Sequence, residues 1–285
     1  MGVDVEVEAR LALLCDEAAR VGGDVVVASG DGPVPPTLAD RRNLTWLEDP
    51  VAGLFALRRK AVAVATGEVI VISEDHCAVE PGWLGRVLAS HARLPDADVV
   101  VGRVVNGTDA TPIDRAAFYV SLAPLVAPID THGAWSQVPV AGASLKRRAV
   151  DRLVAACPDL PLELVPGATL EALGLCFVVD ETLSVAHLQS GGWRFHAALH
   201  FHNARAVSGS PWHRRRARTW ARLLAAPLLV GVRVARTLRQ VHRKHVPLAA
   251  VLALGPGVAW LYGVKSAGEW AGALLGAGGS ARLVR

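Results

Sequence analysis

The apolar run at 69–73 is the feature that most constrains how this chain folds. It reads Val-Ile-Val-Ile-Ser and is followed at once by Glu74-Asp75-His76. A β-branched run without polar alternation predicts a strand buried on both faces, as in the sheet of an α/β protein. In open α/β sheets, ligands bind outside the carboxyl ends of the strands. The sequence therefore predicts a core strand that delivers two carboxylates and an imidazole to a binding edge.

Helical and extended patterns alternate through residues 1–105. In order, we expect a half-polar strand at 3–7, a helix over 9–21, a strand over 24–28, a helix over 52–66, the strand at 69–73, a helix over 83–91 and a strand over 98–105. A short helix over 168–173 and strand segments at 176–179 and 183–186 are expected farther along. Such alternation predicts an α/β fold with a mostly parallel sheet and helices on both faces.

Basic charge is concentrated in the last third of the chain. Residues 193–285 carry 15 of the 30 Lys and Arg residues but only one of the 26 Asp and Glu residues. This asymmetry predicts contact with an anionic surface. The basic residues alternate with long apolar stretches and are not interleaved with aromatic residues that would stack on nucleic-acid bases. The pattern therefore favours a membrane surface as the partner and argues against nucleic acid.

The basic region also has helical periodicity. It opens with a basic run at 213–218 and an apolar stretch at 223–232. Arginines then recur every three or four residues on one side of an expected helix: Arg233, Arg236, Arg239 and Arg243. Apolar residues fall on the other side: Val230, Val234, Leu238 and Val241. This is the pattern of an amphipathic helix at a membrane interface.

The segment 247–264 runs 18 residues without a charge, which just reaches the length needed to span a bilayer. Gly255-Pro256-Gly257 interrupts it. Because proline breaks or kinks a helix, we expect a broken or re-entrant membrane hairpin here rather than one straight span. A buried helical hairpin of a soluble domain is the alternative interpretation.

Neither the cysteines nor the first residues indicate secretion. The four cysteines are widely spaced and form no CxxC pair, so they predict neither a zinc site nor a disulfide framework. The acidic start of the chain lacks the basic and apolar regions of a signal peptide. We therefore expect a cytosolic body.

Short motifs flank the Glu-Asp-His cluster: Arg58 and Ala65-Thr66-Gly67-Glu68 before it, and Pro81-Gly82-Trp83-Leu84 after it. Together with the cluster they resemble family-2 glycosyltransferases of the GT-A fold. Segment 58–68 reads Arg-Arg-Lys-Ala-Val-Ala-Val-Ala-Thr-Gly-Glu, similar to the family's Arg followed by Ala-x-Gly-Glu. Glu74-Asp75-His76 occupies the place of the family's Asp-x-Asp after an apolar strand. Glu80-Pro81-Gly82-Trp83-Leu84 then resembles the family's Pro-Gly-Trp-Leu helix start. The spacing matches without gaps.

The resemblance continues to about residue 205. Segment 138–144 reads Val-Pro-Val-Ala-Gly-Ala-Ser, similar to the family's Pro-Gly-x-Asn segment. Gly174 is followed 13 residues later by His187, similar to the family's Gly…Val-x-x-His ending. Several motifs in the same order are more specific than any one of them.

The resemblance implies a nucleotide-sugar donor and a divalent metal. Arg58, Glu74 and Asp75 are implied to face the diphosphate, with an exposed helical arginine as the alternative for Arg58. Asp75, His76 and His187 are implied to hold the cation, or His187 is a strand-end histidine bonded to the backbone. His76 stands where the family commonly has a metal-contacting Asp, and imidazole suits Mn²⁺ better than Mg²⁺.

Two carboxylates compete for the role of general base implied by the resemblance. Counting back from Gly174 without gaps favours Glu163, whereas a register shift at Pro166-Gly167 would favour Glu171. The nucleobase position is altered as well. The family's second strand ends in an Asp pair, and here only Asp31 follows the strand at 24–28, displaced by two residues.

Two further patterns limit the function. His196 and His200 lie four residues apart on an expected helix but have no carboxylate between them as in the zincin motif, so core histidines are the better interpretation. The Gln-x-x-Arg-Trp motif of processive polysaccharide synthases is absent from the sequence. Transfer of a single residue is therefore expected.

Together these patterns predict a GT-A-like domain over 1–205 and a basic, apolar helical region over 206–285 at the cytoplasmic face of the cell membrane. The expected activity is inverting transfer of one sugar, of the hexosyl class, to a lipid-linked or cell-envelope glycan. The alternative is a catalytically inactive member of the family that acts as a membrane-bound scaffold.

Overall fold

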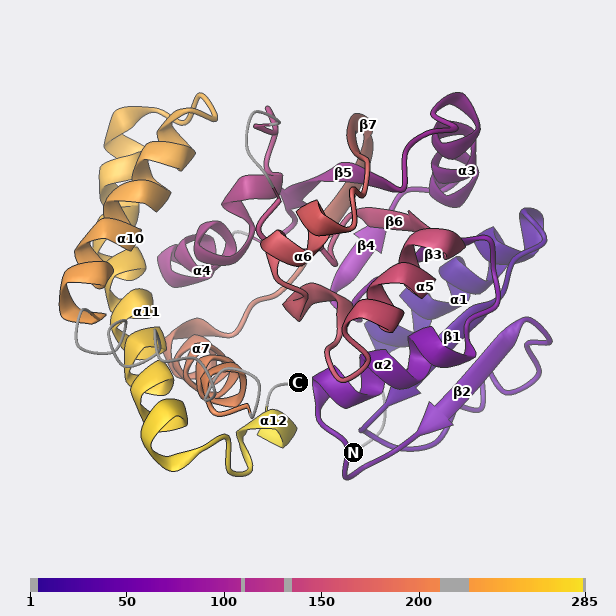
Figure 1. The fold of residues 1–285 in the computed structure, drawn as a ribbon, viewed down its shortest axis with the longest axis horizontal. Helices are drawn as coiled ribbons and strands as arrows, with labels where there is room; N and C mark the ends of the chain where they lie inside the picture. The colour runs from indigo at the N-terminus through magenta and orange to yellow at the C-terminus, as the bar shows by residue number, and fades with distance from the viewer. Residues whose placement is uncertain (1–4, 109–110, 131–134, 211–225, 284–285) are drawn as a thin grey trace. The chain divides into compact units, whose positions relative to one another are not determined.

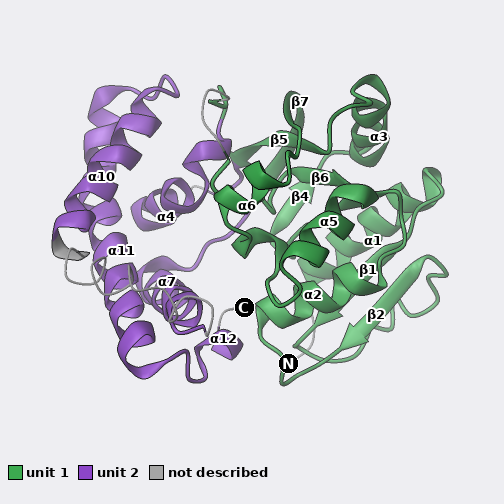
Figure 2. Ribbon diagram, viewed as in Figure 1, with its two compact units in different colours: residues 1–105, 127–187 green, residues 106–126, 188–285 purple. Residues whose placement is uncertain are grey.

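A computed structural model of the chain describes residues 5–108, 111–130, 135–210 and 226–283 (Figure 1). It divides into two compact units (Figure 2). Unit 1 comprises Met1–Val105 and Ala127–His187, and unit 2 comprises Asn106–Val126 and Leu188–Arg285. The expected division at 205 and 206 follows motifs and charge rather than compactness, and it stays a prediction. The basic run at 213–218 lies outside the described residues.

Unit 1 alternates helices and strands. Its helices are α1 Val5–Arg20, α2 Leu54–Val64, α3 Trp83–Arg93, α5 Arg147–Ala156 and α6 Gly167–Ala172, with the short 3-10 helix η2 Leu162–Leu164. Its strands are β1 Val25–Ser29, β2 Leu44–Glu48, β3 Val69–Val71, β4 Cys77–Val79, β5 Val99–Asn106, β6 Ala143–Lys146 and β7 Phe177–His187. The predicted α/β class is confirmed.

The strands form two sheets. β1 and β2 pair in parallel, with Ser29 opposite Glu48. The other five strands lie in the order β3-β6-β5-β7-β4. Within this sheet β6 pairs antiparallel with β3 and with β5, and β4 pairs antiparallel with β7. The expected mostly parallel sheet is wrong for these pairings, because a continuous apolar run predicts burial on both faces and not the direction of the neighbouring strands.

The core of unit 1 is built on β5 and its neighbours. Val99, Val100 and Val101 are completely buried, and Val100 packs in one core with Trp83 and Leu183. The strand at 69–73 is confirmed in its first three residues, and the segment after it carries the polar cluster. The expected burial on both faces is wrong, because β3 lies at the edge of its sheet and only Ile70 of its three residues is buried. The apolar run thus anchors that cluster to the central sheet.

Two predicted elements of unit 1 are wrong in detail. Residues 5–7 belong to α1 and not to a strand, because Glu6 and Glu8 lie in the first helical turn, where the helix dipole favours carboxylates. The two strand segments expected around Asp180-Glu181 are one strand, β7. The buried Asp180 carboxylate accepts hydrogen bonds from Ser90 Oγ at 2.7 Å and Arg93 Nη2 at 2.5 Å, so its charge is compensated inside the strand.

Unit 2 is helical. Its elements are α4 Pro112–Leu122, η1 Ala123–Leu125, α7 Gly192–Ser208, α10 Ala226–His242, α11 Leu248–Leu275 and α12 Ser280–Leu283. α11 packs against α4, α7 and α10 (Figure 1). Ile113, Ala116, Val258 and Leu261 lie in the shared core. Unit 2 is therefore organised around α11.

One carboxylate ties the starts of α4 and α7 together. Asp114 Oδ1 accepts hydrogen bonds from the backbone N–H groups of Gly191 and Gly192 at 3.1 Å and lies 2.7 Å from His196 Nε2. Asp114 Oδ2 accepts a hydrogen bond from the Thr111 hydroxyl at 2.6 Å. His196 and His200 are both buried, which confirms that they are core histidines.

The hairpin expected at 247–264 is wrong, because α11 runs unbroken from Leu248 to Leu275. Pro256 lies on the exposed side of the helix, and so does Leu252, four residues before it, where the missing hydrogen bond would have its acceptor. Gly257 has a packing role: a Cβ there would lie 2.9 Å from the Cβ of Ala116 in α4. The Gly-Pro-Gly sequence thus marks a close helix contact and not a turn.

Among the described residues, α11 is the one helix long and apolar enough to cross a membrane by length and composition. In the apolar 18-residue stretch of this helix, 33% of the residues are buried within the protein. The core helix of a soluble protein meets the same criteria, so this finding alone is weak support for membrane association.

Candidate functional site

The Glu-Asp-His cluster lies in the tight turn between β3 and β4. The backbone N–H of Cys77 donates to the Glu74 carbonyl at 2.9 Å and closes this turn. β4 then pairs with β7 so that Cys77 lies opposite His187. The register brings the ring of His187 to His76, with their centroids 4.6 Å apart in an edge-on arrangement. Strand pairing, and not sequence proximity, places these two imidazoles together.

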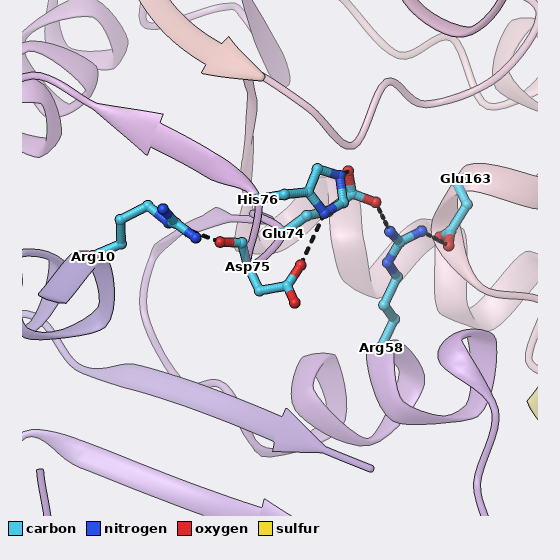
Figure 3. Close-up of polar contacts among 6 residues, drawn as sticks. All are labelled: Arg10, Arg58, Glu74, Asp75, His76 and Glu163. Carbon is cyan, nitrogen blue, oxygen red and sulfur yellow. Dashed lines mark hydrogen bonds and ion pairs between the residues drawn. The ribbon is translucent and has the colours of Figure 1, made fainter. Parts of the chain in front are cut away.

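His76 is held between two carboxylates. Its Nε2 lies 3.1 Å from Glu74 Oε2, and its Nδ1 lies 2.8 Å from Asp75 Oδ1. The two acids differ in environment: the Glu74 side chain is 19% exposed and the Asp75 side chain is 66% exposed. Arg10 Nε donates to the Asp75 backbone carbonyl at 2.9 Å and ties the turn to α1 (Figure 3). The ring of His76 is thus fixed from both sides.

Arg58 joins this cluster to the predicted base. Figure 3 shows its guanidinium between the carboxylates of Glu74 and Glu163, and it forms an ion pair with each. Arg58 comes from α2 and Glu163 from η2, so three separate segments meet here. All three side chains are largely buried, with exposed fractions of 14% for Arg58 and 9% for Glu163. A buried charge that lost its partner would cost about 3–5 kcal/mol, so this network has to form as a unit.

The surroundings shift the pKa values of the cluster in opposite directions. Burial opposes charge on Glu74, but the hydrogen bond from His76 and the charge of Arg58 outweigh it and lower its pKa to about 2. Burial likewise opposes charge on His76, yet hydrogen bonds to Asp75 and Glu74 raise its pKa to about 9. Burial raises the pKa of the neighbouring Cys77 thiol to about 12, so this thiol is not a nucleophile.

The donor atoms fit a divalent cation. Glu74, His76 and His187 each offer one ligand atom, and these atoms lie within 4.8 Å of one another. Two imidazoles and one carboxylate suit Mn²⁺ and other first-row transition metals better than Mg²⁺. Imidazole coordinates in its neutral form, so a bound ion would replace the proton on His76. Asp75, which we predicted as a ligand, lies against the other ring nitrogen of His76, and its role as a ligand stays a prediction. Glu74 joins the two histidines in the cluster.

The remaining predicted residues lie apart from this set of contacts. Asp31 lies in the exposed turn after β1, where its backbone N–H donates to Ser29 Oγ at 3.1 Å. Glu171 is exposed on α6. Of the two candidate bases, the structure brings Glu163 to Arg58. The roles of Asp31, Glu163 and Glu171 stay predictions.

Sequence reasoning missed two features of the site. Arg10, far from the cluster in sequence, carried no signal because its role depends on how α1 packs. Glu74 can be a metal ligand only because its side chain points toward His76 and His187. No sequence motif predicts the side-chain direction of Glu74 or the position of His187 beside it. Both follow from tertiary contacts.

Comparison with known proteins finds one family whose matched segment includes part of this site. Residues 40–151 match the family model described as Glycosyl transferase family 2. This segment contains Arg58, Glu74, Asp75 and His76 and ends before Glu163 and His187. Among curated proteins, none matches the chain significantly.

Proposed function

We propose that this chain, in which residues 40–151 match the model of glycosyl transferase family 2, is an inverting glycosyltransferase, of the hexosyl-transferring kind, that uses a nucleotide-sugar donor. It transfers one sugar to a lipid-linked or cell-envelope glycan acceptor. The mixed α/β architecture of unit 1 agrees with the GT-A fold of such enzymes. The observation that carries the proposal is the Glu74–His76–His187 cluster linked through Arg58 to Glu163.

In this proposal Glu163 acts as the general base. Its carboxylate takes the proton of the acceptor hydroxyl while the acceptor oxygen bonds to the anomeric carbon. The bond from that carbon to the diphosphate oxygen breaks in the same displacement, so the configuration inverts. Arg58 holds Glu163 in place through an ion pair in a largely buried setting. Positioning of this kind is what a single displacement requires.

In this proposal the Glu74–His76–His187 cluster faces the leaving group. Glu74, His76 and His187 would hold a divalent cation, with Asp75 orienting the ring of His76. When bound, such an ion would supply positive charge to the departing diphosphate. Asp31, at the edge formed by β1 and β2, is the proposed contact to the nucleobase.

The proposed location is the cytoplasmic face of the cell membrane. Support comes from the apolar helix α11 and from the basic charge of residues 193–285. A membrane location would bring a lipid-linked acceptor to a soluble nucleotide-sugar.

Calorimetry on the full chain tests the proposal. We expect UDP, GDP or dTDP to bind in the presence of Mn²⁺, and His76→Ala or His187→Ala to weaken binding at least tenfold, because each removes a proposed ligand. His242→Ala, at an exposed histidine of α10, is the matched control and should bind as the unmodified chain does. Release of the nucleotide from the corresponding nucleotide-sugar, in the presence of a membrane lipid extract, then measures transfer.

The scaffold interpretation predicts a different result. The Arg58 guanidinium already neutralises Glu74 and Glu163, which would suit a site that no longer handles a diphosphate. A folded chain that binds none of the three nucleotides with Mn²⁺ would overturn the enzymatic proposal in favour of the scaffold.

A further inference from the structure

The exposed face of α11 has no polar side chain along its whole described length. Its exposed positions recur every three or four residues and form one stripe: Leu248, Ala249, Leu252, Ala253, Pro256, Ala259, Gly263, Ala267, Trp270, Leu274 and Leu275. The exposed fraction is 62% for Leu252 and 52% for Leu274. At 1.5 Å per residue this stripe is about 40 Å long. A continuous apolar surface of this size marks an interaction site.

The charged residues of α11 lie off the stripe. Lys265 and Glu269 are only partly exposed, and Glu269 pairs with Arg233 of α10 at 3.0 Å. The remaining sides of the helix pack against α4, α7 and α10. The packing of unit 2 therefore does not explain why the solvent-exposed side of α11 is apolar.

The neighbouring helix α10 differs from what its sequence pattern suggested. Val234, Leu238 and Val241 pack in the core of unit 2 and so are not a membrane-facing side. The exposed side of α10 begins with Leu228 and Val232, which are 74% and 55% exposed, and ends in a basic group. That basic group is Arg236, Arg239 and His242 of α10 together with Arg243 and His245, which directly follow the helix.

The basic group lies beside the first turns of the stripe. α10 and α11 are antiparallel: Leu238 lies near Gly255, and Arg233 lies near Glu269. The basic end of α10 is therefore next to the end of α11 that exposes Leu248 and Leu252 (Figure 1). Glu269 is the one acidic residue within 226–283. Apolar contact and positive charge thus occur together, as in proteins that bind anionic membranes.

We infer that the exposed stripe of α11 lies in the interface of an anionic lipid leaflet, with the basic end of α10 bound to the headgroups. This inference rests on the membrane association in the proposed function and names the surface that makes it. A second copy of the chain fits less well, because its own 226–283 region contains one acidic residue, Glu269, and so offers no acidic patch to match the basic group. Burial of the other sides of α11 favours a helix lying in the interface over one that crosses the bilayer.

Vesicle co-sedimentation of the full chain tests the inference. Vesicles of phosphatidylcholine mixed with phosphatidylglycerol should bind the protein, and vesicles of phosphatidylcholine alone should bind it much more weakly. Leu252→Glu should reduce binding more than tenfold, because it places a charge in the apolar stripe. Arg239→Gln and Arg243→Gln should each reduce binding about fivefold, and added salt should reduce the binding that remains.

Matched controls come from unit 1. Val154 of α5 is 42% exposed, and Arg42 is exposed, so Val154→Glu and Arg42→Gln introduce the same changes on elements other than α10 and α11. Both should bind vesicles as the unmodified chain does. Circular dichroism shows whether each variant is folded.

Three results would overturn the inference: no binding to mixed vesicles, equal loss in the controls, or a dimer in light scattering that Leu252→Glu dissociates. The last would assign the stripe to a second copy. Calorimetry with nucleotide and Mn²⁺ on the same variants separates this inference from the proposed function. Vesicle binding without nucleotide binding would remove the enzymatic proposal and leave the membrane surface in place.

Discussion

Each unit contains a carboxylate bonded to an imidazole, and the two pairs differ in what surrounds them. In unit 1, His76 is bonded to Glu74 and Asp75, and Asp75 is largely open to solvent. In unit 2, His196 and Asp114 are completely or almost completely buried. Backbone amides and a hydroxyl use the remaining acceptor sites of Asp114.

The comparison shows that residue type alone does not distinguish a chemical site from a structural one. Burial raises the pKa of Asp114, but the hydrogen bonds from Thr111, Gly191, His196 and Gly192 outweigh it, and the net shift is strongly downward. A carboxylate with every acceptor site used inside the protein has no position left for a ligand. The cluster at Glu74 keeps an accessible side, and a third candidate ligand, His187, lies beside it.

The largest expected effect is on catalysis in unit 1. Glu163→Gln should lower the transfer rate by about 10²–10⁴-fold, because the amide cannot accept the proton of the acceptor hydroxyl. Affinity for the nucleotide with Mn²⁺ should stay within a few-fold of the unmodified value. Initial rates of nucleotide release and calorimetry measure the two quantities.

Glu171→Gln is the variant that discriminates between the candidate bases. If Glu163 is the base, this exposed change on α6 should leave the rate nearly unchanged. A large loss in Glu171→Gln with little loss in Glu163→Gln would move the role to Glu171. Thermal unfolding of both variants shows whether the broken ion pair with Arg58 has affected the fold.

The next effect is on stability in unit 2. Asp114→Ala should lower the free energy of unfolding by about 3–5 kcal/mol, because it leaves the buried His196 and two backbone amides without their acceptor. Urea unfolding followed by circular dichroism measures the change. Asp151→Ala, at an exposed position of α5, is the control and should change stability by less than about 0.5 kcal/mol. Equal losses in the two variants would contradict a structural role for Asp114.

The smallest effect concerns pH. Burial lowers the pKa of His200 from 6.5 to about 3, with the charges of Lys265 and His196 acting in the same direction. The unfolded chain therefore binds more protons than the folded chain between these values, so stability is complete above pH 6.5 and falls as the pH falls. The expected loss between pH 7 and pH 5.5 is about 1 kcal/mol.

Urea unfolding at both pH values checks this expectation. In His200→Leu the pH dependence should decrease by about that amount, since the leucine does not titrate. His242→Ala, at an exposed histidine, should keep the full dependence. An unchanged dependence in His200→Leu would show that another group is responsible.

Much of unit 1 follows from local patterns in the sequence. The helices at 54–64 and 83–93 and the strand at 99–106 lie where the sequence pattern predicts them. The helix at 83–93 and the strand at 99–106 each bury a regular apolar pattern. Helix α1 and strand β7 differ from the prediction because each contains charged residues that, in sequence, look like the end of an element. In α1 the helix dipole stabilises the carboxylates of the first turn, and in β7 Arg93 pairs with Asp180. The site was predictable only in part. Arg58 and Glu74 lie in a recognisable motif, but the position of Glu163 between Pro161 and Pro166 could not be assigned a register.

The sequence by itself determined the α/β alternation, the polar cluster at the end of β3 and the basic, apolar character of the last third. These are local properties, set by periodicity and composition. Only the tertiary structure decided that Glu163 meets Arg58 across 105 residues, that His187 lies beside His76, and that α11 turns an uncharged face to solvent. Such contacts depend on strand register and helix packing, which are settled by the free energy of the whole fold rather than by any one segment.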